Sequence, residues 1–190
     1  MRNQYFILRH GENVWQVEKK GFVYPWGICR QIKLTEKGKV CVKESSAKLK
    51  KEKIDLIFSS DFQRTRETAK IAAKELGIKK INFDKRLRDI DLGIYNGRPR
   101  KDFLEFCHYK ERKFSTKPPK GESWNDVRER IKNFIQEIDK NYKGKNILII
   151  GHGDPLCLLE GVIKRKTDKQ LLKEIHCGNY IKVAELRKID

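Results

Sequence analysis

The sequence lacks any long hydrophobic run. No stretch of about 18 or more apolar residues occurs, so we expect no segment that spans a membrane. The N-terminal residues lead into a short apolar run, residues 5–8, that is too brief for the core of a signal peptide. We therefore expect a protein of the cytoplasm with no membrane attachment.

Closely spaced cysteine pairs are missing as well. The five cysteines show no CxxC spacing: Cys29, Cys41, Cys107, Cys157 and Cys177. An odd and dispersed set argues against a disulfide framework and against a zinc site. We expect these cysteines to be small apolar side chains in a reducing compartment.

The sequence also lacks a motif of interleaved aromatic and basic residues, although its net charge is +18. The charge comes from 44 Lys and Arg against 26 Asp and Glu, and the basic runs are short or broken by acids. Net charge attracts anions without much specificity. We therefore expect a lysine-rich, solvated surface that draws in anionic substrates, and we do not expect nucleic acid as a partner.

What the chain does contain is an apolar run beside a His-Gly pair near both ends. Residues 5–8 run into Arg9-His10-Gly11, and residues 146–150 run into Gly151-His152-Gly153. Short apolar runs near glycine predict buried strands. If these strands are parallel neighbours, both imidazoles lie at the carboxyl edge of one sheet, where open α/β sheets bind ligands. Two histidines and an arginine there suit an anionic substrate, most simply a phosphate.

Strand and helix patterns alternate along the chain. Strands are predicted over residues 4–8, 54–58, 80–83 and 146–150, with an edge strand over 179–186. Helices are predicted from a Thr35 cap to about Lys50, from a Ser60 or Asp61 cap to Gly77, after a Ser123 cap, and from Pro155. The alternation predicts an α/β fold with a mostly parallel sheet.

The length is that of one domain, residues 1–190, and we find no repeat and no domain boundary. Residues 84–100 are expected to form a loop over the site. Residues 101–120 begin with a helical pattern that is then lost, and we expect a small cap-like insertion around residues 98–121. The insertion contains three basic residues, Lys110, Arg112 and Lys113. They could bind a second anionic group of a substrate, but we favour the interpretation that they form a solvated helix end.

Four side chains at or just beyond predicted strands form the candidate site: Arg9, His10, Arg64 and His152. Arg64 falls in the first turn of a helix, where a cation is unfavourable unless an anion shares the space. Either arginine can form paired hydrogen bonds to phosphoryl oxygens. A neutral histidine is a competent nucleophile toward phosphorus, and cationic neighbours keep it neutral by lowering its pKa.

A departing alkoxide needs a proton donor. The loop over residues 87–93 offers two carboxyl groups for this task, those of Asp89 and Asp91. The remaining histidines, His108 and His176, are expected to be ordinary surface residues.

Six motifs in series resemble those of the histidine phosphatase superfamily, the phosphoglycerate-mutase-like group. They cover most of the chain in the family's order and comprise residues 8–13 with Trp15-Gln16, residues 34–38, 59–69 and 87–97, Gly121-Glu122-Ser123 and Gly151-His152-Gly153. The resemblance implies a phosphoglycerate-mutase-like fold of three layers, α/β/α.

The resemblance implies that His10 is phosphorylated during turnover. It also implies that Arg9, Arg64 and His152 hold the phosphoryl group and stabilise its oxygens in the transition state. It implies no metal ion and no cofactor, because these side chains take the place of a metal.

The family's acid is usually a Glu, and Asp89 stands at that position, one methylene shorter. The resemblance therefore implies Asp89 as the acid, with Asp91 as the alternative. Gln16 stands where many members carry an Asn near the phosphate. Between Trp26 and Leu34 the chain departs from the family's usual spacing. The resemblance therefore does not indicate which residues of this chain form the rim of the pocket.

The expected function is hydrolysis of a phosphomonoester, a small phosphorylated metabolite. The segment between Gly97 and Gly121 is shorter than the cap of the family's typical mutases, which is why a phosphatase is favoured. Phosphoglycerate-mutase-type transfer between substrate hydroxyls is the alternative. A non-catalytic module that binds phosphate or nucleic acid is disfavoured, since a binder has no use for an intact nucleophile. The substrate and the oligomeric state are not indicated.

Overall fold

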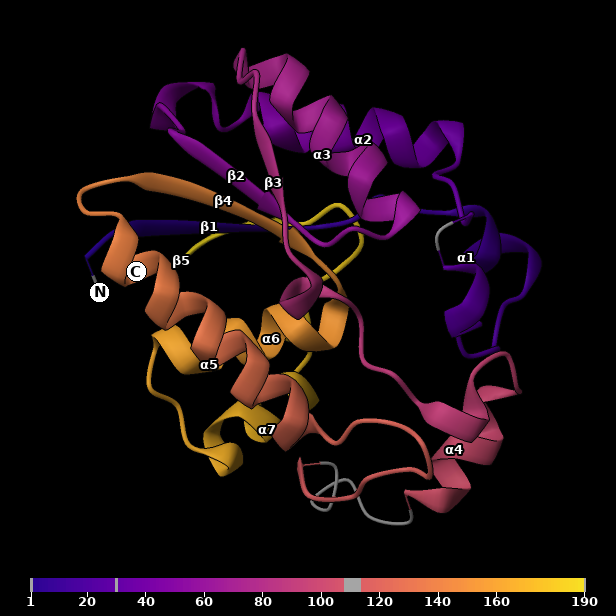
Figure 1. Cartoon of the computed structure of the whole chain (residues 1–190). Helices are drawn as coiled ribbons and strands as arrows, with labels where there is room; N and C mark the ends of the chain where they lie inside the picture. Colours follow the sequence, from indigo (N-terminus) through magenta and orange to yellow (C-terminus); the bar gives the residue numbers. More distant parts are fainter. Residues whose placement is uncertain (1, 30, 108–113, 190) are drawn as a thin grey trace.

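A computed structural model describes residues 2–29, 31–107 and 114–189 (Figure 1). At its centre is a five-stranded sheet with the strand order β3-β2-β4-β1-β5. The strands are β1 (Gln4–Arg9), β2 (Leu56–Ser59), β3 (Ile81–Phe83), β4 (Asn146–Gly151) and β5 (Leu186–Ile189). The first four are parallel to one another, and β5 runs antiparallel along the edge beside β1. The predicted α/β fold with a mostly parallel sheet is confirmed.

Helices cover both faces of the sheet, which gives the three layers (Figure 1). On one face lie α2 (Glu36–Ala47) and α3 (Gln63–Leu76). On the other lie α5 (Trp124–Asn141) and α6 (Gly153–Ile163), with α7 (Asp168–His176) against α6. Two short helices, α1 (Val14–Glu18) and α4 (Arg100–Phe106), lie beyond the carboxyl ends of the strands.

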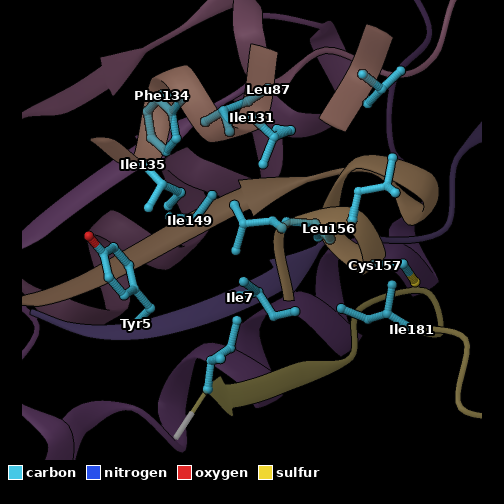
Figure 2. Packing of buried hydrophobic residues seen from close by; sticks show 14 of the residues in the cluster. Tyr5, Ile7, Leu87, Ile131, Phe134, Ile135, Ile149, Leu156, Cys157 and Ile181 are labelled. Carbon is cyan, nitrogen blue, oxygen red and sulfur yellow. The ribbon is translucent and has the colours of Figure 1, made fainter. Parts of the chain in front are cut away.

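The two faces of the sheet have separate apolar cores. Successive residues of a strand point to opposite faces, so Tyr5 and Ile7 lie in one core while Phe6 and Leu8 lie in the other. Figure 2 shows the first core, in which side chains of β1 and β4 meet Ile131, Phe134 and Ile135 of α5 and Leu156 of α6. Burial on both faces explains why the strands read as continuous apolar runs.

Two predicted helix caps are confirmed, and one is wrong. The Thr35 hydroxyl accepts from the Gly38 N–H, and the Ser123 hydroxyl accepts from the Asp126 N–H. At α3, however, the residue in the cap position is Phe62, without a side-chain cap bond. The two residues predicted as alternative caps of this helix have other partners. The Asp61 carboxylate binds Arg88, and the Ser60 hydroxyl binds His152.

Helix α6 begins at Gly153, two residues before the predicted start at Pro155. Proline is tolerated there because the first N–H groups of a helix have no intrahelical acceptor. His152 is therefore the residue between the end of β4 and the first turn of α6.

The edge strand predicted over residues 179–186 is wrong in position, since β5 spans Leu186–Ile189. Ala184 adopts a left-handed backbone conformation with φ of 56°, which interrupts an extended chain. Its N–H donates to the His10 carbonyl, while the Ile181 carbonyl accepts from Arg9 Nη1. Residues 179–184 thus form a loop at the carboxyl end of β1 instead of a ladder.

Helices α1 and α7 were not predicted, although each begins with a capping box that the sequence contains. The reciprocal pairs are Asn13 with Gln16 and Thr167 with Gln170. The predicted loop over residues 84–100 ends at residue 99, because α4 begins at Arg100, and it contains two short 3₁₀ turns, Lys85–Leu87 and Gly93–Tyr95. His108, Lys110, Arg112 and Lys113 lie outside the described residues.

No helix in the described part of the chain is long and apolar enough to cross a membrane.

The turn that follows β1 packs directly on the first turn of α2. Thr35 N donates to the Glu12 carbonyl, and Thr35 Oγ1 donates to the Glu12 carboxylate at 2.9 Å. A Cβ atom added to Gly38 would lie 2.1 Å from the Glu12 carbonyl oxygen, which leaves no room for a side chain. This close approach fixes the backbone that immediately follows His10.

We predict that Gly38→Ala forces this turn apart and lowers the free energy of unfolding by about 1–3 kcal/mol, the usual cost of overpacking. The measurement is urea unfolding. Gly27→Ala is the matched control, because a Cβ there meets nothing within 4 Å. Equal effects of the two substitutions would contradict the tight packing of the turn on α2.

Candidate active site

Parallel pairing of β1 with β4 sets Arg9 opposite Gly151 and brings His10 beside His152. The two imidazole ring centroids are 5.3 Å apart, and both side chains are buried. The edge they share is the carboxyl edge of the sheet, where a parallel α/β fold leaves space for a ligand.

The tautomer of His10 follows from the hydrogen bond of its imidazole ring. Nδ1 lies 2.8 Å from the Gly11 carbonyl oxygen, which can only accept, so Nδ1 carries the proton. In the neutral ring, the lone pair is then on Nε2. Burial, assisted by Arg64 and Arg9, holds the pKa of His10 well below its ordinary value of 6.5, so the ring stays neutral.

His152 forms its hydrogen bond through Nε2, whereas His10 uses Nδ1. Its Nε2 lies 2.9 Å from the Ser60 hydroxyl, and its Nδ1 lies 3.7 Å from Asp89 Oδ2. Burial, together with Arg64, holds the pKa of His152 well below its ordinary value. When Nε2 accepts from Ser60, the neutral ring carries its proton on Nδ1, the atom on the Asp89 side.

Arg64 comes from the first turn of α3 and has no exposed side-chain surface. Its Nη2 donates to Asp89 Oδ2 at 2.9 Å, and its guanidinium lies 4.1 Å from the centre of the Tyr24 ring. Nη1 is 3.6 Å from the thiol of the buried Cys29. A buried cation is costly unless it is paired, so these contacts account for its position.

Arg9 is the last residue of β1 and directly precedes His10. Its Nη1 donates to the Ile181 carbonyl at 2.8 Å, and its guanidinium lies 5.4 Å from the centre of the Tyr180 ring. The Tyr180 hydroxyl in turn donates to Asp154 at 2.9 Å. The loop over residues 179–184 therefore orients Arg9.

Three N–H groups at this edge are buried without a hydrogen-bond acceptor among the described residues: Arg9 Nε, Arg64 Nε and His152 Nδ1. Buried donors in proteins nearly always have an acceptor. An anion with several oxygens supplies such acceptors, and two guanidinium groups favour a tetrahedral phosphoryl group. The Asp89 carboxylate, which contacts Arg64, already places one anionic oxygen beside His152.

The two candidate acids have different surroundings. Asp91 Oδ1 accepts from the Gly93 N–H at 2.8 Å and from Asn96 Nδ2 at 2.6 Å, so it stabilises its own turn. Asp89 instead faces Arg64 and His152. Burial raises the pKa of Asp89, while Arg64 opposes that rise. Of the two carboxyl groups, that of Asp89 is therefore the one that faces other candidate site residues.

The loop that carries Asp89 is held by an Arg130–Glu122 ion pair. Arg130 Nε donates to Glu122 Oε1 at 2.9 Å, and Arg130 Nη2 donates to the Asp89 carbonyl at 3.0 Å. The Glu122 carboxylate also accepts from the Asp91 N–H at 3.0 Å. These bonds fix the backbone that immediately follows the Asp89 side chain.

Gln16 lies in the wall of the cavity that Arg9 and Asp89 also line. Its side-chain oxygen accepts from the Asn13 N–H and from Asn13 Nδ2 in the capping box of α1. Contact of Gln16 with a phosphate therefore stays a prediction, one that would use its amide nitrogen.

Several residues of the site were not anticipated from the sequence. Tyr24 and Cys29 contact Arg64, and Tyr180 contacts Arg9, from loops without a recognisable motif. Ser60 was expected to cap a helix but binds His152. For Ser60 a signal was present, because it follows a strand that ends at the same edge.

A family model described as the histidine phosphatase superfamily (branch 1) matches residues 5–187. The chain belongs to this superfamily. The match covers nearly the whole chain, including both strand-end histidines, and confirms the resemblance seen in the motifs.

Among curated relatives, phosphoserine phosphatase 1 of Hydrogenobacter thermophilus is 29% identical over 82% of this chain and 75% of its own length. The probable phosphoglycerate mutase GpmB of Escherichia coli is also 29% identical, over 84% of this chain and 74% of its own. A mycobacterial glucosyl-3-phosphoglycerate phosphatase structure matches with a TM-score of 0.82 at 20% identity, over 97% of this chain and 88% of that one, which shows the shared fold.

The low pKa values of the two histidines predict a pH dependence of stability. Below the unfolded value of 6.5, the unfolded chain binds protons that the folded histidines do not, so stability falls as the pH falls. Each histidine contributes a loss of about 1.4 kcal/mol per pH unit in this range.

His152→Gln retains a group able to bind Ser60 but removes one of these titrations. We expect the free energy of unfolding of this variant to fall less steeply between pH 6.5 and pH 5, by about 1.4 kcal/mol per pH unit. Urea unfolding at several pH values measures the slope. Parallel curves for the two proteins would contradict a neutral, buried His152.

Proposed function

We propose that this superfamily member is a phosphomonoesterase that hydrolyses a small phosphorylated metabolite through a phosphohistidine intermediate on His10. The observation that carries the proposal is the fixed tautomer of His10, whose Nδ1–H donates to Gly11 and leaves the Nε2 lone pair free. The buried Arg64 and His152 and the half-buried Arg9 lie at the same sheet edge, and each has a buried N–H group without an acceptor among the described residues.

In the first step, His10 Nε2 attacks phosphorus and the bond to the ester oxygen breaks. Arg9, Arg64 and His152 hold the other phosphoryl oxygens and stabilise their charge in the transition state. The leaving oxygen takes a proton from Asp89. In the second step, water attacks phosphorus, the P–N bond breaks, and Asp89 takes up the proton that water releases.

The surroundings of Asp89 support its part in both steps. Burial raises its pKa and so favours the protonated form, while the contact with Arg64 lowers the pKa and stabilises the deprotonated carboxylate. The bonds from Arg130 and Glu122 to the backbone of its loop limit its movement. These contacts compensate in part for a side chain one methylene shorter than Glu.

Phosphoglycerate-mutase-type transfer shares the first step, and the Escherichia coli relative is named a probable mutase. The two functions differ in the group that accepts the phosphoryl from His10. With water as acceptor, inorganic phosphate is released; with a substrate hydroxyl, the phosphoryl group is retained in an ester. We favour water because the segment between Gly97 and Gly121 is short for a mutase cap.

The proposed reaction needs no metal ion, because the two guanidinium groups provide the positive charge that a metal would supply. Its partner is a small phosphorylated substrate, and nucleic acid and membranes are not part of the proposal. We place the enzyme in the cytoplasm, where unpaired cysteines remain reduced.

We predict that His10→Ala lowers the hydrolysis of 4-nitrophenyl phosphate by at least about 1000-fold, because the nucleophile is lost. Acid-labile, base-stable phosphate should label the wild type and be absent from the variant. Wild-type activity should persist in excess EDTA. Circular dichroism and the unfolding midpoint serve as controls for folding, and undiminished turnover in a folded variant would refute the assignment.

The acceptor is tested in the same assay by adding phosphoglycerate or excess glycerol. Release of phosphate without transfer supports a phosphatase. Retention of the label in a second ester would establish the mutase reaction instead.

Asp89→Asn should reduce kcat/KM for glycerol phosphate by about 100-fold, since a poor leaving group depends on protonation. For 4-nitrophenyl phosphate, whose leaving group needs no proton, the loss should be less than about threefold. Asp91→Asn is the matched control and should lower stability without changing the ratio of the two rates. An equal loss for both esters in Asp89→Asn would move the acid role to another group.

A further inference from the structure

A cavity of about 490 Å³ adjoins the candidate active site of Arg9, His10, Arg64 and His152, which we call the phosphoryl site. Arg9 and Asp89 line the cavity, together with residues of α1, α4 and α7. Pockets for drug-sized ligands have volumes of about 300–1,000 Å³. The cavity therefore has room for a leaving group larger than a three-carbon acid beside the phosphoryl group.

One part of the wall is apolar and partly exposed. Phe22 and Leu104 are among the few large apolar side chains with high exposure, at 43% and 59%. Both line this cavity, together with Phe103 and Trp124. Apolar side chains that remain exposed around a concave site indicate a surface that a ligand covers.

Another part of the wall is cationic. Lys19, Lys20 and Arg100 line the cavity, and none forms an ion pair with another residue in the described ranges. The carboxyl groups of the wall are Asp89 and Asp154, and they already contact Arg64 and Tyr180 respectively. Cations without a counter-charge favour an anionic group on the ligand.

The cationic and apolar parts are joined through the backbone. Arg100 N donates to the Gly21 carbonyl at 2.7 Å, and Val23 N donates to the Arg98 carbonyl at 2.9 Å. A β-bridge pairs Phe22 with Pro99. The segment after α1 and the start of α4 therefore form one continuous rim, which holds Phe22 and Arg100 near each other.

Trp15 places a hydrogen-bond donor in the wall of the cavity. It lines the cavity, and its indole N–H is buried without a partner among the described residues. A ligand in this cavity can supply the missing acceptor through an ester or carboxylate oxygen.

Resting on the phosphomonoesterase function proposed above, we propose that the substrate's leaving group is an aromatic alcohol that carries a second anionic group. Its ring packs against Phe22 and Phe103, and its anionic group binds Lys20 and Arg100. The phosphoryl site then supplies the chemistry, while the rim selects this combination of an apolar body and a second negative charge.

Four phosphate esters test the aromatic ring and the second anionic group separately: p-tolyl phosphate, the phosphate ester of 4-hydroxyphenylacetate, 3-phosphoglycerate and glycerol phosphate. The two aryl esters differ by a carboxylate on the para-methyl carbon. We expect kcat/KM to be highest for the 4-hydroxyphenylacetate ester, at least about tenfold above p-tolyl phosphate, as a charge-assisted contact provides. A higher kcat/KM for 3-phosphoglycerate than for both aryl esters would overturn the proposal.

The cationic part is tested with the double variant Lys20→Gln/Arg100→Gln. It should lower kcat/KM for the 4-hydroxyphenylacetate ester by about tenfold and for p-tolyl phosphate by less than about twofold. Lys37→Gln/Lys101→Gln is the matched control, with the same change in charge at exposed positions outside the cavity. Equal losses for the two esters would overturn the assignment of the second anion.

The apolar part is tested with Phe22→Ser, which should raise KM for both aryl esters by about fivefold and leave 3-phosphoglycerate unchanged. Val17→Ser is the control, since Val17 is 58% exposed on α1 and does not line the cavity. An unchanged KM for the aryl esters would overturn the aromatic assignment.

Failure of the underlying function gives a different result. In that case none of the four esters releases phosphate and no label appears on His10. Phosphate release with no difference among the esters would overturn the proposed leaving group alone and leave the phosphomonoesterase function intact.

Discussion

The buried guanidinium of Arg64 is the constraint on which the site depends. A cation without exposed surface needs partners close by, and Arg64 finds them in the Asp89 carboxylate, the Tyr24 ring and the Cys29 thiol. These partners come from loops that are distant in sequence. Their arrangement around one charge fixes the positions of the loop before α2 and the loop after β3 relative to the sheet edge.

The same burial sets the protonation states that the proposed reaction needs. It lowers the pKa of His10 and His152 and raises that of Asp89, so each group is driven toward its uncharged form. A neutral imidazole is the nucleophilic form, and a protonated carboxyl group is the donor form. Opposite shifts in a base and an acid thus arise from one physical cause, the exclusion of water.

Local patterns predicted the parts of the fold that depend on local physics: the four parallel strands, the caps at Thr35 and Ser123, and the two histidines at one sheet edge. The partners of the site could not be predicted in this way. Tyr24 and Tyr180 reach the arginines through tertiary packing. The last strand was misplaced because the left-handed conformation of Ala184 leaves no signature in an alternating sequence.

The rim of the cavity is attached to the protein differently from the phosphoryl site. His10, His152 and Arg64 are buried at the ends of core elements, whereas Phe22 and Leu104 are exposed and the rim segments meet through a few main-chain contacts. Substitutions of exposed side chains usually change stability by less than about 0.5 kcal/mol. Under the proposed function, mutation of the rim can therefore alter the choice of leaving group with little loss of stability. Substrate preference can then evolve separately from the proposed chemistry.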